Sequence, residues 1–215
     1  MRIPSLILVF LPLALYGGFL WRVWGKKGGA PLLVATGLGG GALLGSALLQ
    51  ELLPVPDLSV PWSMLYERLI RSALIEEVMR YLLTLLIVTQ KKDTWTKQVF
   101  IGTDKVQGAL FWGLWGAFGG LVFATLETIL YTLRFSGSLW VRLLPTSLIH
   151  GTCGALIGQG IYKEKGRVSF IFALVIHGLY NVLVGLPLFF SAIGVIFAVL
   201  VFFVFWAPLL KEVKK

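Results

Sequence analysis

Apolar stretches of helical length alternate with short polar or proline-containing breaks along the chain. An α-helix needs about 20 predominantly apolar residues to cross the hydrocarbon core of a bilayer. We predict helices at residues 5–21, 31–53, 62–89, 106–133, 139–162, 168–185 and 187–210. A lysine-rich loop is expected after Thr89. The predicted fold is an all-α polytopic transmembrane bundle of about seven helices, with residues 1–215 forming a single integral membrane domain.

Composition and charge add an orientation to this fold. The chain is 57% hydrophobic and 13% charged, and its mean hydropathy is +0.86, which is typical of a membrane protein. The net charge of +9 would suggest nucleic acid as the partner of a soluble protein. Here thirteen of the 19 basic residues lie in alternate connections and the carboxyl tail: Arg22, Lys26, Lys27, Lys91, Lys92, Lys97, Lys105, Lys163, Lys165, Arg167, Lys211, Lys214 and Lys215. Because such residues accumulate on the cytoplasmic side, we predict an outside amino terminus, a cytoplasmic carboxyl terminus and no nucleic-acid partner.

Three charged residues interrupt the apolar pattern of the third predicted helix. Glu76, Glu77 and Arg80 lie within the stretch SALIEEVMRYLLT at residues 72–84. Each charge at the centre of a bilayer costs roughly 2.5 to 3.5 kcal/mol, so these side chains are expected to face protein or water. Helical geometry places them on one arc of the helix. We therefore expect other polar groups of the membrane region to converge on this arc.

Later helices carry further polar side chains at similar depth. Glu127 shares a helix face with glycines, which favours close contact with another helix. His150 lies on the next predicted helix, and His177 and Asn181 are spaced i to i+4 on the one after that. The structural alternative is a Glu127 neutralised by Arg134 and histidines that only join helices through hydrogen bonds. We favour a shared polar site, because the two histidines are the only ones in the chain.

Such a site suits two chemistries. Carboxylates that share a water can act first as a general base and then as a general acid. Alternatively, histidines and glutamates can hold a zinc ion that activates the water. The zinc ligands would then come from Glu76, Glu127, His150 and His177. The chain has no H-E-x-x-H motif, and the spacing of these residues leaves both chemistries open.

Four short motifs carry a family resemblance. They are Glu76-Glu77-Val78-Met79-Arg80, Phe123-Ala-Thr-Leu-Glu127, His150, and His177-Gly-Leu-Tyr-Asn181, in a core of about residues 62–185. In this order they resemble the superfamily that joins the PrsW proteases with the CAAX prenyl protease and bacteriocin-processing (CPBP or Abi) proteins. The PrsW branch is the more similar, because Glu127 stands where the CAAX branch has histidine and Arg80 follows Glu77 by three residues.

The resemblance implies an intramembrane endopeptidase that uses a glutamate-activated water and no cofactor, in preference to zinc. Glu76 would be the base, and Glu77 would orient the water or the substrate backbone. His177 and Asn181 would donate hydrogen bonds to the developing oxyanion, and His150 would assist.

The remaining motif residues have less direct roles under this resemblance. Arg80 and Phe123 would support the site. The role of Glu127 is the least defined, because it replaces the histidine of the CAAX branch.

The resemblance also implies a cellular setting. The substrate would be another membrane protein in the lipid bilayer, and PrsW substrates include an anti-sigma factor. The protein would be a multi-pass component of a bacterial or archaeal cell membrane, of open oligomeric state. Alternatives are a CAAX-type peptidase, an ion- or proton-binding protein or transporter, and an inactive scaffold or immunity protein on the same bundle.

Overall fold

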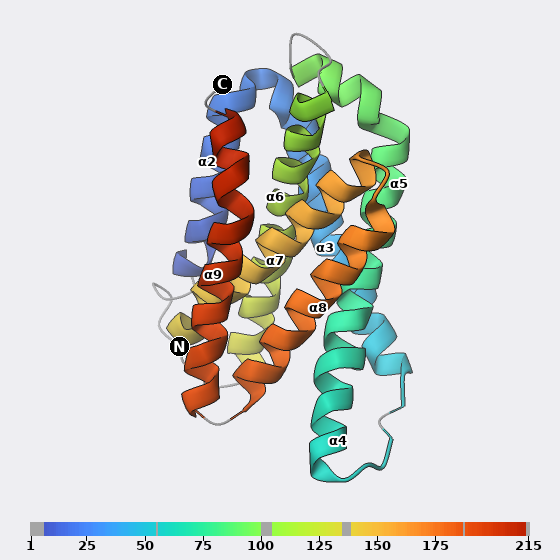
Figure 1. The fold of residues 1–215 in the computed structure, drawn as a ribbon, viewed down its shortest axis with the longest axis vertical. Helices are drawn as coiled ribbons and strands as arrows, with labels where there is room; N and C mark the ends of the chain where they lie inside the picture. The colour runs from blue at the N-terminus through green and yellow to red at the C-terminus, as the bar shows by residue number, and fades with distance from the viewer. Residues whose placement is uncertain (1–6, 55, 100–104, 135–138, 187, 214–215) are drawn as a thin grey trace.

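The fold was obtained as a computed structural model that describes residues 7–54, 56–99, 105–134, 139–186 and 188–213. Every regular element in these ranges is helical (Figure 1), which confirms the predicted all-α class. The elements are η1 (Leu8–Phe10), α2 (Leu11–Trp24), η2 (Gly25–Gly28), α3 (Gly29–Leu52), α4 (Val60–Leu65), η3 (Tyr66–Leu74), α5 (Ile75–Val99), α6 (Lys105–Arg134), α7 (Leu139–Tyr162), α8 (Gly166–Gly185) and α9 (Leu188–Val213). The η3 segment is a π-helix that continues directly into α5.

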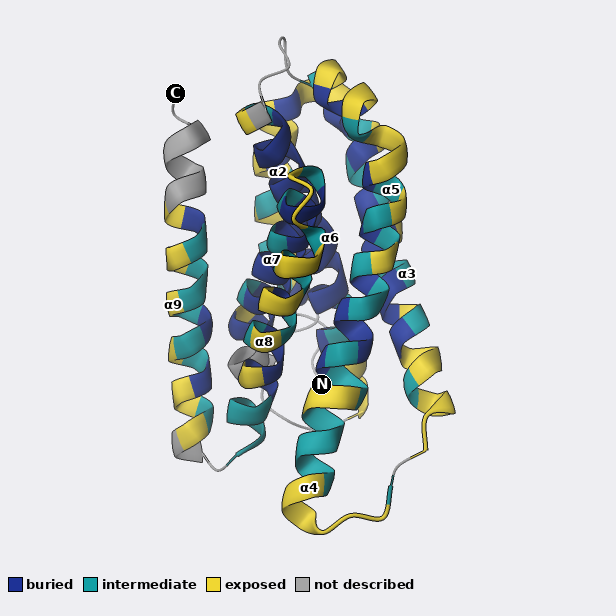
Figure 2. Ribbon diagram, turned by 45° about the vertical axis from the view of Figure 1, so that its right-hand side comes forward, coloured by how far each residue is buried: buried dark blue, intermediate teal, exposed yellow. Residues whose placement is uncertain are grey.

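The bundle is organised around α6. The long helices run roughly along one axis, and α2 and α3 form a hairpin through η2 at the upper end (Figure 1). Within Val106–Arg134 of α6, 89% of an apolar stretch of 18 residues is buried, and the α6 ribbon is largely dark blue in Figure 2. Helix α7 packs along α6, and α8 and α9 follow on the outside of α7. Consequently, α6 is the central helix: α2, α3, α5 and α7 pack against it, whereas α8 packs mainly on α7.

The α6–α7 interface is close because glycines line it from both sides. A Cβ atom at Gly116 would collide with the backbone of Gly154, and one at Gly120 would collide with the backbone of His150. Only residues without a side chain permit this approach. The predicted close contact on the Glu127 face of α6 is therefore confirmed, and it brings the backbone of His150 against α6.

The predicted lysine-rich loop after Thr89 is wrong, because α5 continues to Val99. The segment after Thr89 contains no glycine or proline that would end the helix. Trp95 is buried in it, and its ring lies 5.7 Å from that of Trp112 and 6.1 Å from that of Trp115 on α6. Burial of these indoles stabilises the extra turns, while Lys91 stays exposed.

The protein is an integral membrane protein. Length and hydropathy mark four described stretches as able to cross a bilayer: Leu8–Leu52, Val106–Arg134, Gly166–Gly185 and Phe190–Ala207. The first of these contains both α2 and α3. Helices α5 and α7 are also long, at 25 and 24 residues, but they carry more polar residues. The number of crossings, predicted as about seven, therefore stays a prediction.

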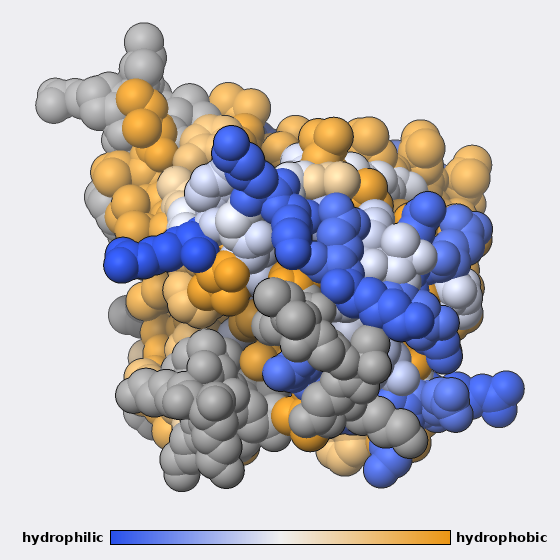
Figure 3. All heavy atoms as spheres, turned by 90° about the horizontal axis from the view of Figure 1, so that it is seen from above, coloured by the Kyte–Doolittle hydropathy of each residue, from blue (hydrophilic) through white to orange (hydrophobic). Residues whose placement is uncertain are grey.

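The two ends of the bundle differ in charge. The turn η2, the last turns of α5 and the α7–α8 connection lie toward the same end (Figure 1), and they expose Lys26, Lys27, Lys91, Lys97 and Lys163. Hydrophilic side chains spread across this end of the molecule in Figure 3. We call it the basic end. The described residues that connect α3 to α4, and α4 itself, lie at the opposite end.

Candidate active site

The structure brings all the predicted site side chains into one continuous set of contacts. They come from four helices: Glu76, Glu77 and Arg80 from α5, Phe123 and Glu127 from α6, His150 from α7, and His177 and Asn181 from α8. All of them except Glu127 are buried. Residues that are up to about a hundred positions apart in the chain thus meet inside the bundle.

A buried ion pair forms the centre of the site. Glu77 is 0% exposed and Arg80 is 1% exposed, and Arg80 donates a hydrogen bond to Oε1 of Glu77. The guanidinium carbon of Arg80 also lies 4.8 Å from the ring centroid of Phe123, within the range of a cation–π contact. Two opposite charges in direct contact are tolerated at this depth because each offsets the other's loss of hydration.

The second guanidinium nitrogen of Arg80 determines which ring nitrogen of His150 carries the proton. Nη2 of Arg80 lies 2.8 Å from Nδ1 of His150, and arginine can only donate hydrogen bonds. Nδ1 is therefore the acceptor, and a neutral imidazole then carries its proton on Nε2. That nitrogen lies 2.9 Å from Oε2 of Glu127, whose side chain is 24% exposed. Glu127 thus holds His150 in a defined tautomer and orientation.

The ring of His177 is oriented from the opposite side. Its Nδ1 lies 2.8 Å from Oε1 of Glu77, which is an acceptor as a carboxylate, so Nδ1 donates the hydrogen bond. Nε2 of His177 then keeps a free lone pair and faces Oε2 of Glu76 at 3.7 Å. A histidine held by a carboxylate through one nitrogen presents the other nitrogen in a fixed direction.

Glu76 has contacts that sequence reasoning did not predict. Its Oε1 accepts hydrogen bonds from Oγ of Ser72 at 3.0 Å and from Nε2 of Gln50, on α3, at 3.4 Å. Nδ2 of Asn181 donates to Oγ of Ser72 at 2.9 Å. The position of Ser72, one helical turn before Glu76, was a usable signal, whereas nothing in the sequence links Gln50 to the motifs.

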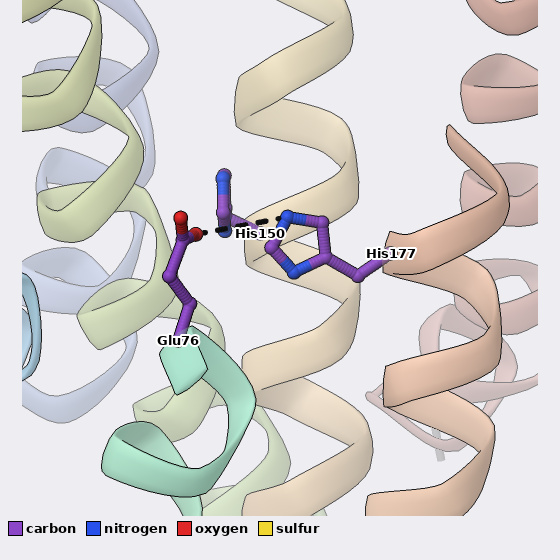
Figure 4. Close-up of side chains that lie close together, drawn as sticks. All are labelled: Glu76, His150 and His177. Carbon is purple, nitrogen blue, oxygen red and sulfur yellow. Dashed lines mark ion pairs between the residues drawn. The ribbon is translucent and has the colours of Figure 1, made fainter. Parts of the chain in front are cut away.

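Three side chains of the site have the types and positions of metal ligands. Glu76, His150 and His177 each offer one ligand atom, and these atoms lie within 4.8 Å of one another. Figure 4 shows the three side chains converging from α5, α7 and α8. Their types fit zinc, and Oε2 of Glu76 is buried without a hydrogen-bond partner among the described residues.

Two of the predicted zinc ligands, His150 and Glu127, fit a metal site less well than Glu76 and His177. His150 could bind a metal only if it released Arg80 or Glu127, because both of its ring nitrogens have partners. Glu127, the fourth predicted ligand, lies outside the group of three and contacts Nε2 of His150 instead.

Comparison with known proteins identifies the family. A family model described as the PrsW family intramembrane metalloprotease matches residues 29–209. Searches of curated proteins and of solved structures returned no match. The family match covers most of the chain and includes all four helices that build the site. The chain therefore belongs to the PrsW family of intramembrane proteases.

Proposed function

We propose that this intramembrane protease cleaves a peptide bond of a membrane-protein substrate with a water activated by Glu76. The observation that carries the proposal is the position of Oε2 of Glu76. This oxygen is buried, has no hydrogen-bond partner among the described residues, and faces the free Nε2 of His177. Two acceptor atoms side by side can hold the two hydrogens of one water molecule.

The two adjacent glutamates have different environments, which supports Glu76 as the base. Oε2 of Glu77 also lacks a partner among the described residues, but Glu77 is paired with Arg80 and holds His177. The charge of Glu77 therefore serves to hold Arg80 and His177 in place. Glu76 contacts no arginine or lysine in the described part of the chain, and His177 is its only ion-pair neighbour there.

The reaction follows from these positions. Glu76 takes a proton from the water as the water oxygen attacks the carbonyl carbon of the substrate. It then returns that proton to the leaving amine, so that one carboxyl group serves as base and then as acid. His177 orients the water through Nε2. It has no second N–H for the oxyanion role that the resemblance implies, because its Nδ1–H is bonded to Glu77. The amide of Asn181 donates one N–H to Ser72 and has a second N–H for the carbonyl oxygen of the substrate, where a preorganised donor contributes a few kcal/mol.

The family description raises a metal-dependent variant of the same reaction. Glu76, His150 and His177 would hold the ion, and zinc would supply a Lewis acid that activates water. We place the glutamate mechanism first because both nitrogens of His150 are engaged. Metal content and peptidase activity of the detergent-purified protein separate the two mechanisms. We expect activity to survive chelation, and activity that is lost on chelation and restored by zinc would overturn this choice.

The location of the site bears on the substrate. Fifteen residues separate Glu76 from the exposed Lys91 on α5, a rise of about 22 Å. The site therefore lies away from the basic end. If the basic end is cytoplasmic, as the charge bias favours, cleavage occurs toward the outer half of the membrane. A single-pass protein such as an anti-sigma factor of a bacterial or archaeal cell is a substrate of this kind.

The test compares matched glutamine variants. Wild-type protein and Glu76→Gln are reconstituted in liposomes with single-pass substrates, and fragments are identified by mass spectrometry. Glu76→Gln should lose at least 100-fold in turnover, because a carboxamide cannot accept the proton. Glu51→Gln, at an exposed position near the end of α3, should behave as wild type. Cleavage by Glu76→Gln at the wild-type rate would refute the proposal.

A further inference from the structure

Two residues outside the four motifs contact the proposed base. We infer that Gln50 and Ser72 are positioning residues that hold the carboxylate of Glu76 with Oε2 turned toward His177. This inference rests on the proposed function, since it concerns the same reactive oxygen. It adds α3 and η3 to the elements that build the site.

Both residues bind the same oxygen of Glu76. Oγ of Ser72 lies 3.0 Å and Nε2 of Gln50 lies 3.4 Å from Oε1. Oε2 has no hydrogen-bond partner among the described residues and lies 3.7 Å from Nε2 of His177. Rotation of the carboxylate plane away from this orientation would break both hydrogen bonds. The pair of donors therefore distinguishes one oxygen of Glu76 from the other.

Asn181 fixes the direction of the Ser72 hydrogen bond. A serine hydroxyl has one hydrogen to donate and two lone pairs that accept. Nδ2 of Asn181 donates to Oγ of Ser72 at 2.9 Å, so the single hydrogen of Ser72 stays available for Glu76. The motif residue Asn181 thus acts on Glu76 through Ser72, in addition to its proposed hydrogen bond to the substrate carbonyl.

Gln50 is held in place by a second set of contacts. Nη2 of Arg71 donates to the backbone oxygen of Gln50 at 2.5 Å, and Nη1 of Arg71 donates to Oε1 of Glu67 at 2.8 Å. Arg71, Glu67 and Ser72 all lie on η3. The last turn of α3 is therefore tied to the same π-helical segment that presents Ser72. Segments of π-helix occur frequently at functional sites.

Close packing places α3 beside the base. Helices α3 and α5 pack against each other, and the methyl end of the Met79 side chain on α5 fills the space beside Gly45 on α3, five residues before Gln50. Gln50 itself is only partly buried. Its side-chain amide therefore reaches Glu76 from the edge of the bundle and is not fixed by packing in the hydrophobic core.

If Gln50 and Ser72 only stabilised the packing of α3 and α5, their variants would behave differently from variants of positioning residues. In that case, loss of Gln50 or Ser72 would lower the amount of folded protein and leave the turnover of each folded molecule unchanged. A positioning role predicts the opposite, because a displaced reactive group costs rate after the substrate has bound. The separation of kcat from KM is therefore the decisive measurement.

The experiment uses the full-length protein in liposomes with a cleavable single-pass substrate. Ser72→Ala and Gln50→Leu should each lower kcat about tenfold and leave KM within about twofold, since each removes a hydrogen bond to a charged group. Ser72→Thr keeps the hydroxyl and should restore most of the rate. The matched controls are Ser63→Ala, on α4, and Gln98→Leu, at an exposed position of α5 near the basic end.

A spectroscopic readout is independent of proteolysis. The carboxyl stretching band of Glu76 is assigned as the infrared band that is lost in Glu76→Gln. Ser72→Ala and Gln50→Leu should shift this band, and both control variants should leave it in place.

The outcomes separate this inference from the proposed function. Unchanged kcat and an unchanged band in both variants would overturn the positioning role while Glu76→Gln stays inactive. A fall in folded protein with normal kcat would also overturn it. If Glu76→Gln is active, the proposed function fails, and the infrared band alone then decides whether Gln50 and Ser72 orient this carboxylate.

Discussion

At the scale of single residues, the site depends on a charge that is fully removed from water. Arg80 neutralises Glu77 and donates to His150. Arg80→Met would leave the Glu77 carboxylate buried without its partner, which costs about 3 to 5 kcal/mol of stability. Thermal unfolding in detergent should therefore occur at a much lower temperature for this variant than for wild type.

A double variant tests whether the loss arises from the unpaired charge. Adding Glu77→Gln to Arg80→Met removes that charge and should recover part of the stability. Arg22→Met, at an exposed position of α2, is the control and should unfold like wild type. If Arg80→Met is as stable as the Arg22 variant, the buried pair does not hold the site together.

Glu127 is expected to act through His150. Its Oε2 accepts the Nε2–H of His150, and a glutamine at this position offers an amide oxygen for the same hydrogen bond. Glu127→Gln should therefore keep most of the peptidase activity, whereas Glu127→Ala should lose about tenfold, as expected for a lost hydrogen bond to a charged group. Initial rates at saturating substrate measure both. Equal loss in the two variants would show that the charge of Glu127 is itself required.

The sequence could predict which polar residues meet in the candidate site, because charges and histidines are costly in apolar helices and stand out there. It could not predict how they pair. Glu76 and Glu77 are neighbours in the same motif, yet Arg80 pairs with Glu77, and Ser72 binds Glu76. These choices depend on side-chain directions from several helices, which a one-dimensional pattern does not contain.

At the scale of helices, glycines on α6 position His150. A methyl group at Gly120 would meet the backbone oxygen of His150, so Gly120→Ala must push α7 away from α6. Overpacking of this kind costs about 1 to 3 kcal/mol, and it should also displace His150 from Arg80. We expect reduced thermal stability and a larger reduction in peptidase rate.

The control for this prediction is a glycine with open space. No heavy atom lies within 4 Å of the position that a Cβ would take at Gly37 on α3. Gly37→Ala should keep wild-type activity and unfold at the same or a slightly higher temperature, since alanine favours the helix. If the Gly120 and Gly37 variants behave alike, close packing of α6 on α7 is not what places His150.

Helix positions were accessible from hydropathy, whereas one helix end was not. The apolar pattern stops near Thr89, but α5 continues to Val99 because Trp95 packs against indoles of α6. That contact joins residues distant in sequence. The role of Gln50 was missed for the same reason, since its partner Glu76 lies on a different helix.

At the scale of the whole molecule, the charge difference between the two ends predicts how the protein lies in the membrane. The basic end should face the cytoplasm, and the end that carries the α3–α4 connection should face outside. The chain contains a single cysteine, Cys153, which is 0% exposed. A membrane-impermeant maleimide should therefore give little background labelling, and introduced cysteines can report the two ends.

Two exposed positions serve as probes, Ser59 beside α4 and Lys91 near the basic end. Ser59→Cys should be labelled in intact cells, and Lys91→Cys only after the membrane is opened. The site lies on the Ser59 side of the bundle, because about 22 Å of α5 separates Glu76 from Lys91. Labelling in the reverse order would place the site toward the cytoplasm. Substrates cut on the outer side of the membrane would then be excluded, even if the peptidase chemistry of Glu76 is correct.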